Sequence, residues 1–309
     1  MINGLHHITA IAGDPKENYD YYTKTLGLRL VKKSINQDAP DTYHLFYADG
    51  VGNPGTDLTF FPWPAMGPAK PGAGKAVEVT FAVKTGSYDY WKKRLEDFDQ
   101  NVKEETRFGA KHLIFADPHG LELAITETSD KRDFEVWDKS PVPVEYQIRW
   151  MHSVRILVRD IKNTELLLTR IMGFKKNGED KGWHRFGINN GESGTLIDVF
   201  VNPELSAGRW GTGGIHHIAW RVKDSQDEMK VRELVLKAGL SPSPQIDRFW
   251  FKSVYFQEPG GVLFEIATDG PGFDRDEDAE HLGEKLILPP WYESQRDEIE
   301  RNLPPINTK

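Results

Sequence analysis

Two pairs of adjacent histidines and one glutamate are the residues whose types and spacing could hold a metal ion. His6-His7 stands in LHHITAI and His216-His217 stands in IHHIAWRV, each pair at the start of an apolar run. Glu265 lies in VLFEIAT, a run that is otherwise apolar. Imidazoles and carboxylates are ligands of divalent transition metals. These residues would form a metal site if the fold brought them together.

The number of ligands indicates which chemistry such a site would support. Two histidines and one carboxylate leave three adjacent positions open on a six-coordinate ion, which is the arrangement of non-haem Fe(II) oxygenases. A zinc isomerase or lyase of similar fold would more often use four protein ligands. A buried charge such as Glu265 is costly without a partner, and a divalent cation is the strongest one available. The alternative is a Glu265 that is paired with an arginine or hydrogen-bonded within the core.

Composition excludes several classes of function. The chain has 309 residues and no cysteine, which excludes disulfides, thiolate catalysis and Cys-ligated metals and leaves only nitrogen and oxygen ligands. The formal charge of -8, without a Lys/Arg cluster, argues against nucleic acid and membrane partners. No basic leader with a long apolar stretch opens the sequence, and no run is long enough to span a bilayer, so we expect a cytoplasmic protein.

An internal repeat organises the chain. Apolar runs that end in a small charged turn occur at HHITAIAGD, EVTFAVKTG, HSVRILVRD and HHIAWRVKD, and each is typical of a strand. A segment of helical character follows each run, and three of these segments stop at a glycine suited to a left-handed cap: Gly27, Gly173 and Gly239. Further strand-like runs come next. The sequence therefore predicts an α+β fold of four βαβββ modules that pair into two barrel-like domains.

The length of the chain also favours two domains. We expect two modules in residues 1–128, a linker at 129–147, which is charged and contains PVP, and two modules in residues 148–270. Residues 271–309 are polar with Pro-marked ends. They predict a C-terminal tail that packs on the surface with one short helix.

Strand periodicity decides which histidine of each pair can face a pocket. Successive residues of a strand point to opposite faces, so only one member of each pair can do so. The strand ends VRD at 158–160 and VKD at 222–224 supply an alignment of the modules. The alignment places three residues at the position of His217: His7, Glu78 and Ser153.

Only the first and fourth modules carry histidine at this position. We therefore expect these two modules to pair and to hold His7, His217 and Glu265 between them. The rival arrangement pairs the adjacent third and fourth modules, which have the shorter connection, and uses His152 in place of His7. His152 is off register by one residue, and such a slip puts a side chain on the wrong face.

Several motifs carry a family resemblance. LHHITAI, PGTDLTFFPWP, GGIHHIAWRV, EPGGVLFEIATDGPGF and the tail LILPPWYESQRDEIERNLPPI resemble ring-cleaving, extradiol-type dioxygenases of the vicinal oxygen chelate (glyoxalase/bleomycin resistance) superfamily, in particular hydroquinone 1,2-dioxygenases. The resemblance runs over essentially the whole chain. It implies the vicinal oxygen chelate fold and an Fe(II) ion, or Mn(II) in its place, on His7, His217 and Glu265.

The resemblance also implies catalytic roles. Tyr255 stands ten residues before Glu265 and Arg248 seven residues earlier still, as in that group. Tyr255 and His6 become candidates for proton transfer, and Arg248 for binding substrate or stabilising negative charge. From the residues alone, the preferred interpretation of Tyr255 is a half-buried aromatic and that of Arg248 is a solvated loop charge. His6 could instead orient its strand, and His216 and Thr9 match positions near the metal.

The expected function follows from the site and the resemblance together. We expect a non-haem Fe(II)-dependent ring-cleaving dioxygenase that acts with O2 on a hydroquinone- or catechol-type aromatic. Phe249, Trp250 and Phe251 are expected to shape a flat apolar pocket. The alternatives are a metal-dependent glyoxalase-type isomerase or transferase, and a non-catalytic protein of the same fold that binds an aromatic ligand. The partners are then a small aromatic substrate and O2, with homo-oligomer formation left open.

Overall fold

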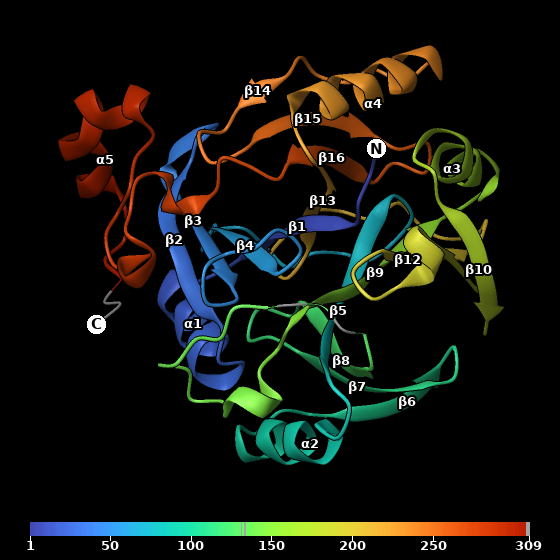
Figure 1. The fold of residues 1–309 in the computed structure, drawn as a ribbon, viewed down its shortest axis with the longest axis horizontal. Coiled ribbons are helices and arrows are strands. Elements are labelled where there is room, and N and C mark those ends of the chain that lie inside the picture. The colour runs from blue at the N-terminus through green and yellow to red at the C-terminus, as the bar shows by residue number, and fades with distance from the viewer. Residues whose placement is uncertain (131, 133, 307–309) are drawn as a thin grey trace.

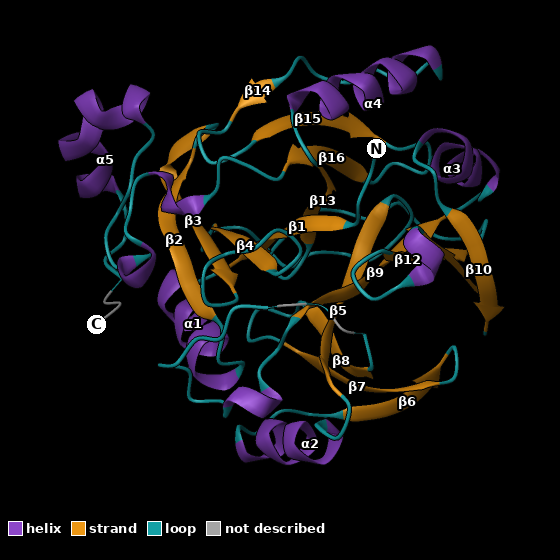
Figure 2. Ribbon diagram, viewed as in Figure 1, coloured by secondary structure: helices purple, strands orange, loops and turns teal. Residues whose placement is uncertain are grey.

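Two curled eight-stranded sheets form the body of the protein, with helices outside them (Figures 1 and 2). The structure is a computed structural model and describes residues 1–130, 132 and 134–306. The remaining positions of the expected linker and tail lie outside the described residues. The chain builds four modules, each made of one strand, one helix and three further strands, so the predicted α+β fold of βαβββ modules is confirmed.

The first and fourth modules share one sheet, which we call the first sheet. The first module consists of β1 (Leu5–Ala12), α1 (Pro15–Asp20) with a π-helical turn (Tyr21–Thr25), β2 (Arg29–Asn36), β3 (Ala39–Ala48) and β4 (Asp57–Pro62). The fourth module consists of β13 (Ile215–Val222), α4 (Ser225–Lys237), β14 (Ile246–Asp247), β15 (Lys252–Gln257) and β16 (Leu263–Thr268).

The second and third modules share the other sheet, which we call the second sheet. The second module consists of β5 (Lys75–Lys84), α2 (Tyr88–Asp97), β6 (Lys103–Arg107), β7 (Ala110–Ala116) and β8 (Glu122–Thr128). The third module consists of β9 (Trp150–Val158), α3 (Lys162–Leu166) with a π-helical turn (Leu167–Ile171), β10 (Lys175–Asp180), β11 (Trp183–Gly187) and β12 (Leu196–Val201).

Each sheet is joined at its centre by the first strands of its two modules. β1 pairs antiparallel with β13 in the first sheet, and β5 pairs antiparallel with β9 in the second. The strand order is β14-β15-β16-β13-β1-β4-β3-β2 in the first sheet and β10-β11-β12-β9-β5-β8-β7-β6 in the second. The expected pairing of the first and fourth modules is therefore confirmed, and the rival pairing of the third with the fourth is wrong.

Local sequence explains where the helices end. Gly27, Gly173 and Gly239 all have a positive φ, between 72° and 83°, as the predicted left-handed caps require. The first and third helices finish in the π-helical turns named above, which the sequence pattern did not predict. β1 is buried along its whole length, and it lies at the centre of the first sheet, between β13 and β4.

The C-terminal tail wraps the outer edge of the first sheet (Figure 1). Its longest helix is α5 (Arg296–Asn302), which matches the expected short helix. The buried ammonium of Lys32 on β2 pairs with Asp276 and Glu277 of the tail. None of the helices in the described part of the chain combines the length and apolar character needed for a membrane span.

Candidate metal centre

The three expected ligands lie on neighbouring strands at the centre of the first sheet. His7 on β1 and Glu265 on β16 are both register partners of Ala219 on β13, and Ala219 is two residues from His217. Residues two apart on a strand share a face. The sheet register therefore sends all three side chains from one face, and the structure brings them together.

Their ligand atoms converge on one point. His7 Nε2 is 3.2 Å from His217 Nε2 and 3.3 Å from Glu265 Oε2, and His217 Nε2 is 2.9 Å from the same oxygen. Ligands at right angles on bonds of about 2.1 Å would lie about 3.0 Å apart, so these separations suit three adjacent ligands of one ion. All three side chains are buried, with Glu265 fully inaccessible to solvent.

The contacts of Glu265 show that a cation fits this position. Its Oε1 accepts a hydrogen bond of 2.5 Å from Ser253, whereas its buried Oε2 accepts none from any described residue. No Lys or Arg nitrogen in the described part of the chain lies within ion-pair distance, so the alternative of an arginine-paired Glu265 is not what the fold provides. Although burial opposes it, the nearby His7 and His217 hold the pKa of Glu265 well below its usual range.

His6 sets the protonation of the His7 ring. His6 Nε2 is 3.0 Å from the Thr268 carbonyl, which can only accept, so this nitrogen carries the hydrogen. Burial, reinforced by His7, lowers the pKa of His6 to about 3 and keeps its ring neutral. His6 Nδ1 is then an acceptor, and His7 Nδ1, 2.9 Å away, must donate to it. The lone pair of His7 Nε2 is thereby left to face the ligand cluster.

The second pair of histidines repeats this arrangement. His216 Nδ1 is 2.8 Å from His217 Nδ1, and burial lowers the pKa of His216 to about 3. The His216 ring stacks on Trp210 with centroids 4.8 Å apart and planes inclined by 15°. Each outer histidine thus orients an inner one, which is how neighbouring groups commonly fix metal-binding imidazoles.

Tyr255 and Arg248 reach the same site. Tyr255 is the register partner of Glu265, and its hydroxyl accepts a 3.3 Å hydrogen bond from Arg248 Nε. The Arg248 guanidinium also donates to both carboxylate oxygens of Asp38, at 3.2 and 2.8 Å. Burial, together with the charge of Glu265, raises the pKa of Tyr255 above its ordinary value, so its hydroxyl keeps its proton at neutral pH.

A cavity of about 460 Å³ opens beside the ligand cluster. Its polar side chains include those of His7, His217, Tyr255, Arg248 and His44, and its apolar lining is mainly aromatic. The aromatic lining residues are Phe46, Phe61, Trp63, Trp250 and Phe251. The cavity has the size and flat apolar walls suited to a small aromatic molecule.

Two of the three expected pocket aromatics line this cavity. Phe249 does not, because its backbone has a φ of 76° and its ring packs against Trp291 and Arg275 of the tail. His44 was missed by the sequence reasoning. The signal available for it was the histidine shared by YHLFYAD and KHLIFAD, which occupy equivalent strands.

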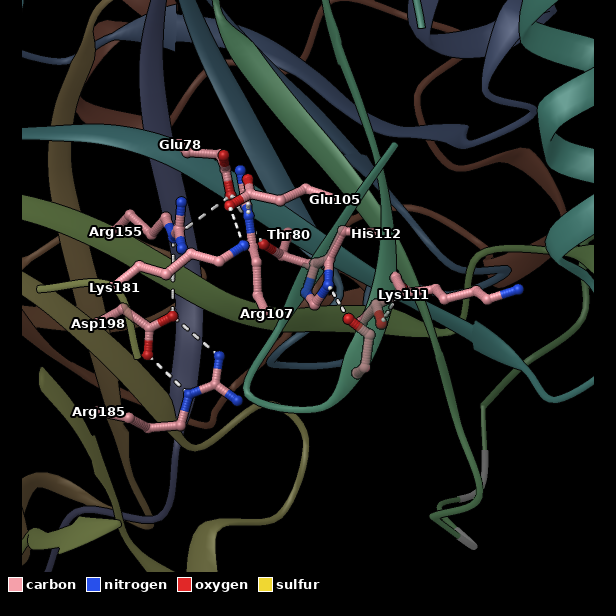
Figure 3. A network of polar contacts seen from close by, with 12 residues as sticks. Glu78, Thr80, Glu105, Arg107, Lys111, His112, Arg155, Lys181, Arg185 and Asp198 are labelled. Carbon is pink, nitrogen blue, oxygen red and sulfur yellow. Dashed lines mark hydrogen bonds and ion pairs between the residues drawn. The ribbon is translucent and has the colours of Figure 1, made fainter. Parts of the chain in front are cut away.

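The equivalent face of the second sheet holds ion pairs instead of a ligand cluster (Figure 3). Asp198 occupies the place of Glu265, because it is the register partner of Arg155, which stands where β13 has Ala219. Arg185 donates to both oxygens of Asp198, at 2.7 and 2.9 Å. Here a guanidinium supplies the positive charge that the buried carboxylate needs.

The sequence analysis placed Glu78 and Ser153 at the equivalent positions of the second sheet, and Glu78 joins this ion-pair network. Glu78, at the place of His7, accepts a 2.6 Å hydrogen bond from Arg107 and lies 3.9 Å from Arg155. Ser153 is buried at the place of His217. His152 Nδ1 is 2.8 Å from Ser193 Oγ, away from the ligand cluster of the first sheet.

Four βαβββ modules in two curled sheets, with two histidines and a carboxylate at the centre of one, define a protein of the vicinal oxygen chelate class. A model of the Glyoxalase/Bleomycin resistance protein/Dioxygenase superfamily matches residues 4–125. Maize glyoxalase I has the same fold, with a TM-score of 0.64 at 14% identity over 86% of this chain and 92% of that one. The predicted superfamily is confirmed.

Relatives with closer sequences extend over nearly the whole chain. MhqE of Bacillus subtilis, whose name assigns it provisionally to the ring-cleaving dioxygenases, is 42% identical over 98% of this chain and 99% of its own. A chlorohydroquinone/hydroquinone 1,2-dioxygenase of Sphingobium indicum is 34% identical over 98% and 96%. A crystal structure of a Bacillus subtilis protein with a provisional dioxygenase assignment gives a TM-score of 0.95 at 39% identity, covering 100% and 98%. The chain belongs to this dioxygenase family of the superfamily.

Proposed function

We propose that this protein is a non-haem Fe(II)-dependent, extradiol-type ring-cleaving dioxygenase that acts with O2 on a hydroquinone- or catechol-type aromatic. The ligand cluster, the aromatic-walled cavity beside it and the names of the relatives support the proposal. The hydroquinone 1,2-dioxygenase relative favours a hydroquinone over a catechol.

One observation carries the metal part of the proposal. The buried Oε2 of Glu265 has two imidazole nitrogens within 3.3 Å and no hydrogen-bond donor among the described residues. The equivalent Asp198 is fully satisfied by Arg185. A buried carboxylate that has no guanidinium partner and lies beside two imidazole nitrogens is a ligand set for a divalent cation.

His7, His217 and Glu265 would hold the ion, Fe(II) with Mn(II) as the alternative. When bound, the ion would supply Lewis acidity towards a ring hydroxyl and a path for electrons between the ring and O2. The cavity beside these three residues would receive the substrate and O2. The apolar walls exclude water from the reacting molecules.

The remaining polar residues divide into two roles. Tyr255 holds a proton at its hydroxyl beside Glu265, and Arg248 fixes that hydroxyl through its Nε and presents positive charge to the cavity. These contacts favour proton transfer by Tyr255 and charge stabilisation by Arg248. His6 does not line the cavity, and both its ring nitrogens are occupied. We therefore assign His6 to positioning His7 rather than to proton transfer.

Oxygen uptake with a panel of hydroquinones and catechols on Fe(II)-loaded protein tests the proposal. The expected result is consumption of one O2 per aromatic molecule and loss of the ring absorbance. His7→Ala is expected to abolish uptake, whereas the control His152→Ala, in the second sheet, is expected to retain it. Stoichiometric zinc in the protein with no oxygen uptake on any aromatic would contradict the proposal and favour a glyoxalase-type isomerase.

A further inference from the structure

The first sheet presents a second polar group to the cavity, from the side opposite Tyr255. In the strand order, β4 is next to β1 and β3 comes after it, just as β16 is next to β13 and β15 comes after it. Thr59 on β4 takes the place of Glu265, and Phe46 on β3 takes the place of Tyr255. His44 stands two residues before Phe46, so it shares the face that lines the cavity.

The side chain of His44 is fixed by its contacts with neighbouring residues of the first sheet. Its Nε2 lies 2.9 Å from Thr59 Oγ1, which in turn lies 2.7 Å from Thr9 Oγ1, so a hydrogen-bonded chain links three strands. The imidazole contacts the rings of both Phe46 and Phe61, with ring centroids 3.8 and 4.5 Å away. A side chain fixed by a hydrogen bond and by two aromatic contacts is already in place for a ligand.

The other ring nitrogen of His44 remains for the cavity. Within the described part of the chain, His44 Nδ1 has no hydrogen-bond partner, and the residue is half-buried and lines the cavity. The other lining residues of β3 and β4 are Ala39, Phe46 and Phe61, all apolar. His44 is thus the polar side chain that these two strands, among their described residues, offer to a bound molecule.

The chemistry of a dihydroxylated ring matches this placement. If one hydroxyl of a hydroquinone lies at the ligand cluster, its para hydroxyl lies on the far side of the ring, towards the aromatic lining of the cavity. A hydroxyl that loses water there without a hydrogen-bond partner weakens binding, by about tenfold or more. A fixed imidazole removes that cost.

We infer that His44 binds the ring hydroxyl remote from the metal and selects hydroquinones over aromatics with a single hydroxyl. The inference rests on the proposed function and names the group that recognises its substrate. Asn36, Gln37 and Asp38 also line the cavity, but Asp38 is engaged with Arg248 and its side chain is 73% exposed. His44 lies deeper and has no such competing ion pair.

The second sheet supplies a matched control. His112 in KHLIFAD occupies the position of His44 in YHLFYAD, because Ile114 pairs with Ala124 as Phe46 pairs with Thr59. His112 Nδ1 is 3.0 Å from the Ala110 carbonyl, and the ring is buried away from the cavity of the first sheet. A substitution of His112 therefore tests the general effect of losing a histidine at this position of the module.

Anaerobic binding to Mn(II)-loaded protein tests the inference without requiring turnover. The dissociation constants of hydroquinone and of 4-methylphenol, which lacks the second hydroxyl, are measured by calorimetry. His44→Leu is expected to weaken hydroquinone binding about tenfold and to leave 4-methylphenol binding unchanged. His44→Gln, which keeps a hydrogen-bonding group, is expected to recover part of the loss. His112→Gln is expected to change neither constant.

The ratio of the two dissociation constants distinguishes recognition of the second hydroxyl by His44 from a structural role of this residue. Equal weakening of both ligands by His44→Leu and by His44→Gln would assign His44 a merely structural role and overturn the inference. An unchanged hydroquinone constant in both variants would overturn it as well. If the wild-type protein binds neither phenol, the proposed function itself fails, and the inference fails with it.

Discussion

The two sheets share a backbone plan and differ in what balances charge on their inner faces. The first sheet keeps a cavity and places two histidines and a glutamate at its centre, and the second fills the same place with ion pairs. The residues at the corresponding positions are His7, His217 and Glu265 in the first sheet and Glu78, Ser153 and Asp198 in the second.

The difference lies in the source of positive charge. In the second sheet, Arg185 and Arg155 pair with the buried carboxylates and stack over Phe108 and Trp183, at 3.8 and 3.9 Å, which fills the concave face. In the first sheet, the residue at the place of Arg155 is Ala219, which leaves space. One fold can therefore support either a packed ion-pair network or an open ligand site, depending on a few side chains.

The largest effect is expected from removing the carboxylate charge of the first sheet. Glu265→Gln should lower the affinity for Mn(II) by at least about 100-fold, because the neutral amide is a poor ligand and cannot balance the ion. Equilibrium dialysis with metal analysis measures the change. Asp198→Asn, the same substitution at the equivalent place of the second sheet, should leave the affinity unchanged. An equal loss of Mn(II) affinity in the two variants would contradict the proposed difference between the two sheets.

Removing the positive charge of Arg185 tests whether ion pairs stabilise the second sheet. Arg185→Met should reduce the free energy of unfolding by about 3 kcal/mol, because it removes the guanidinium that donates both hydrogen bonds to the buried Asp198 and leaves it with Arg155 at 3.7 Å. Urea denaturation of the apoprotein measures the loss. The double variant Arg185→Met/Asp198→Leu should recover most of that stability. Metal binding should persist in the folded single variant, and its loss would show that the two sheets are not independent.

Tyr255 tests the chemistry proposed for the first sheet. Tyr255→Phe should keep the bound metal and lower kcat by about 100-fold, because the hydroxyl that transfers a proton is lost. Steady-state oxygen uptake and metal analysis on the same sample separate these quantities. Tyr90→Phe, on α2 beside the second sheet, is the control. Unchanged kcat in Tyr255→Phe would remove this residue from the mechanism.

The smallest effect is expected in the pH dependence of the free energy of unfolding, through His112 of the second sheet. Burial lowers the pKa of His112 from 6.5 to about 4. Between these values the unfolded chain binds more protons than the folded one, so stability is lost as the pH falls. His112 contributes a slope of at most about 1.4 kcal/mol per pH unit. Urea denaturation from pH 7 to 4 should show a shallower slope in His112→Gln than in the wild type, and identical slopes would refute the assignment.

The repeat and its register could be predicted from sequence because they depend on local patterns. Strand ends such as VRD and VKD fixed the alignment, and the alternation of faces then favoured His7 over His152. The sheet registers of the four central strands agree with that alignment, because His7 pairs with Ala219 as Glu78 pairs with Arg155.

Contacts that depend on the curl of the sheet could not be predicted in this way. The chain from Thr9 through Thr59 to His44 joins three strands whose register no local pattern specifies. Arg248 meets Asp38 because the two ends of the first sheet approach each other. Phe249 was expected in the pocket together with Trp250 and Phe251, but its backbone has a positive φ and its ring packs against the tail.

Anomalous diffraction from crystals grown with Mn(II) tests the central claim most directly. We predict one strong anomalous peak per chain, bounded by His7 Nε2, His217 Nε2 and a carboxylate oxygen of Glu265, and none on the inner face of the second sheet. No peak between those three side chains, or a peak bound instead by His112 or His152, would contradict the account.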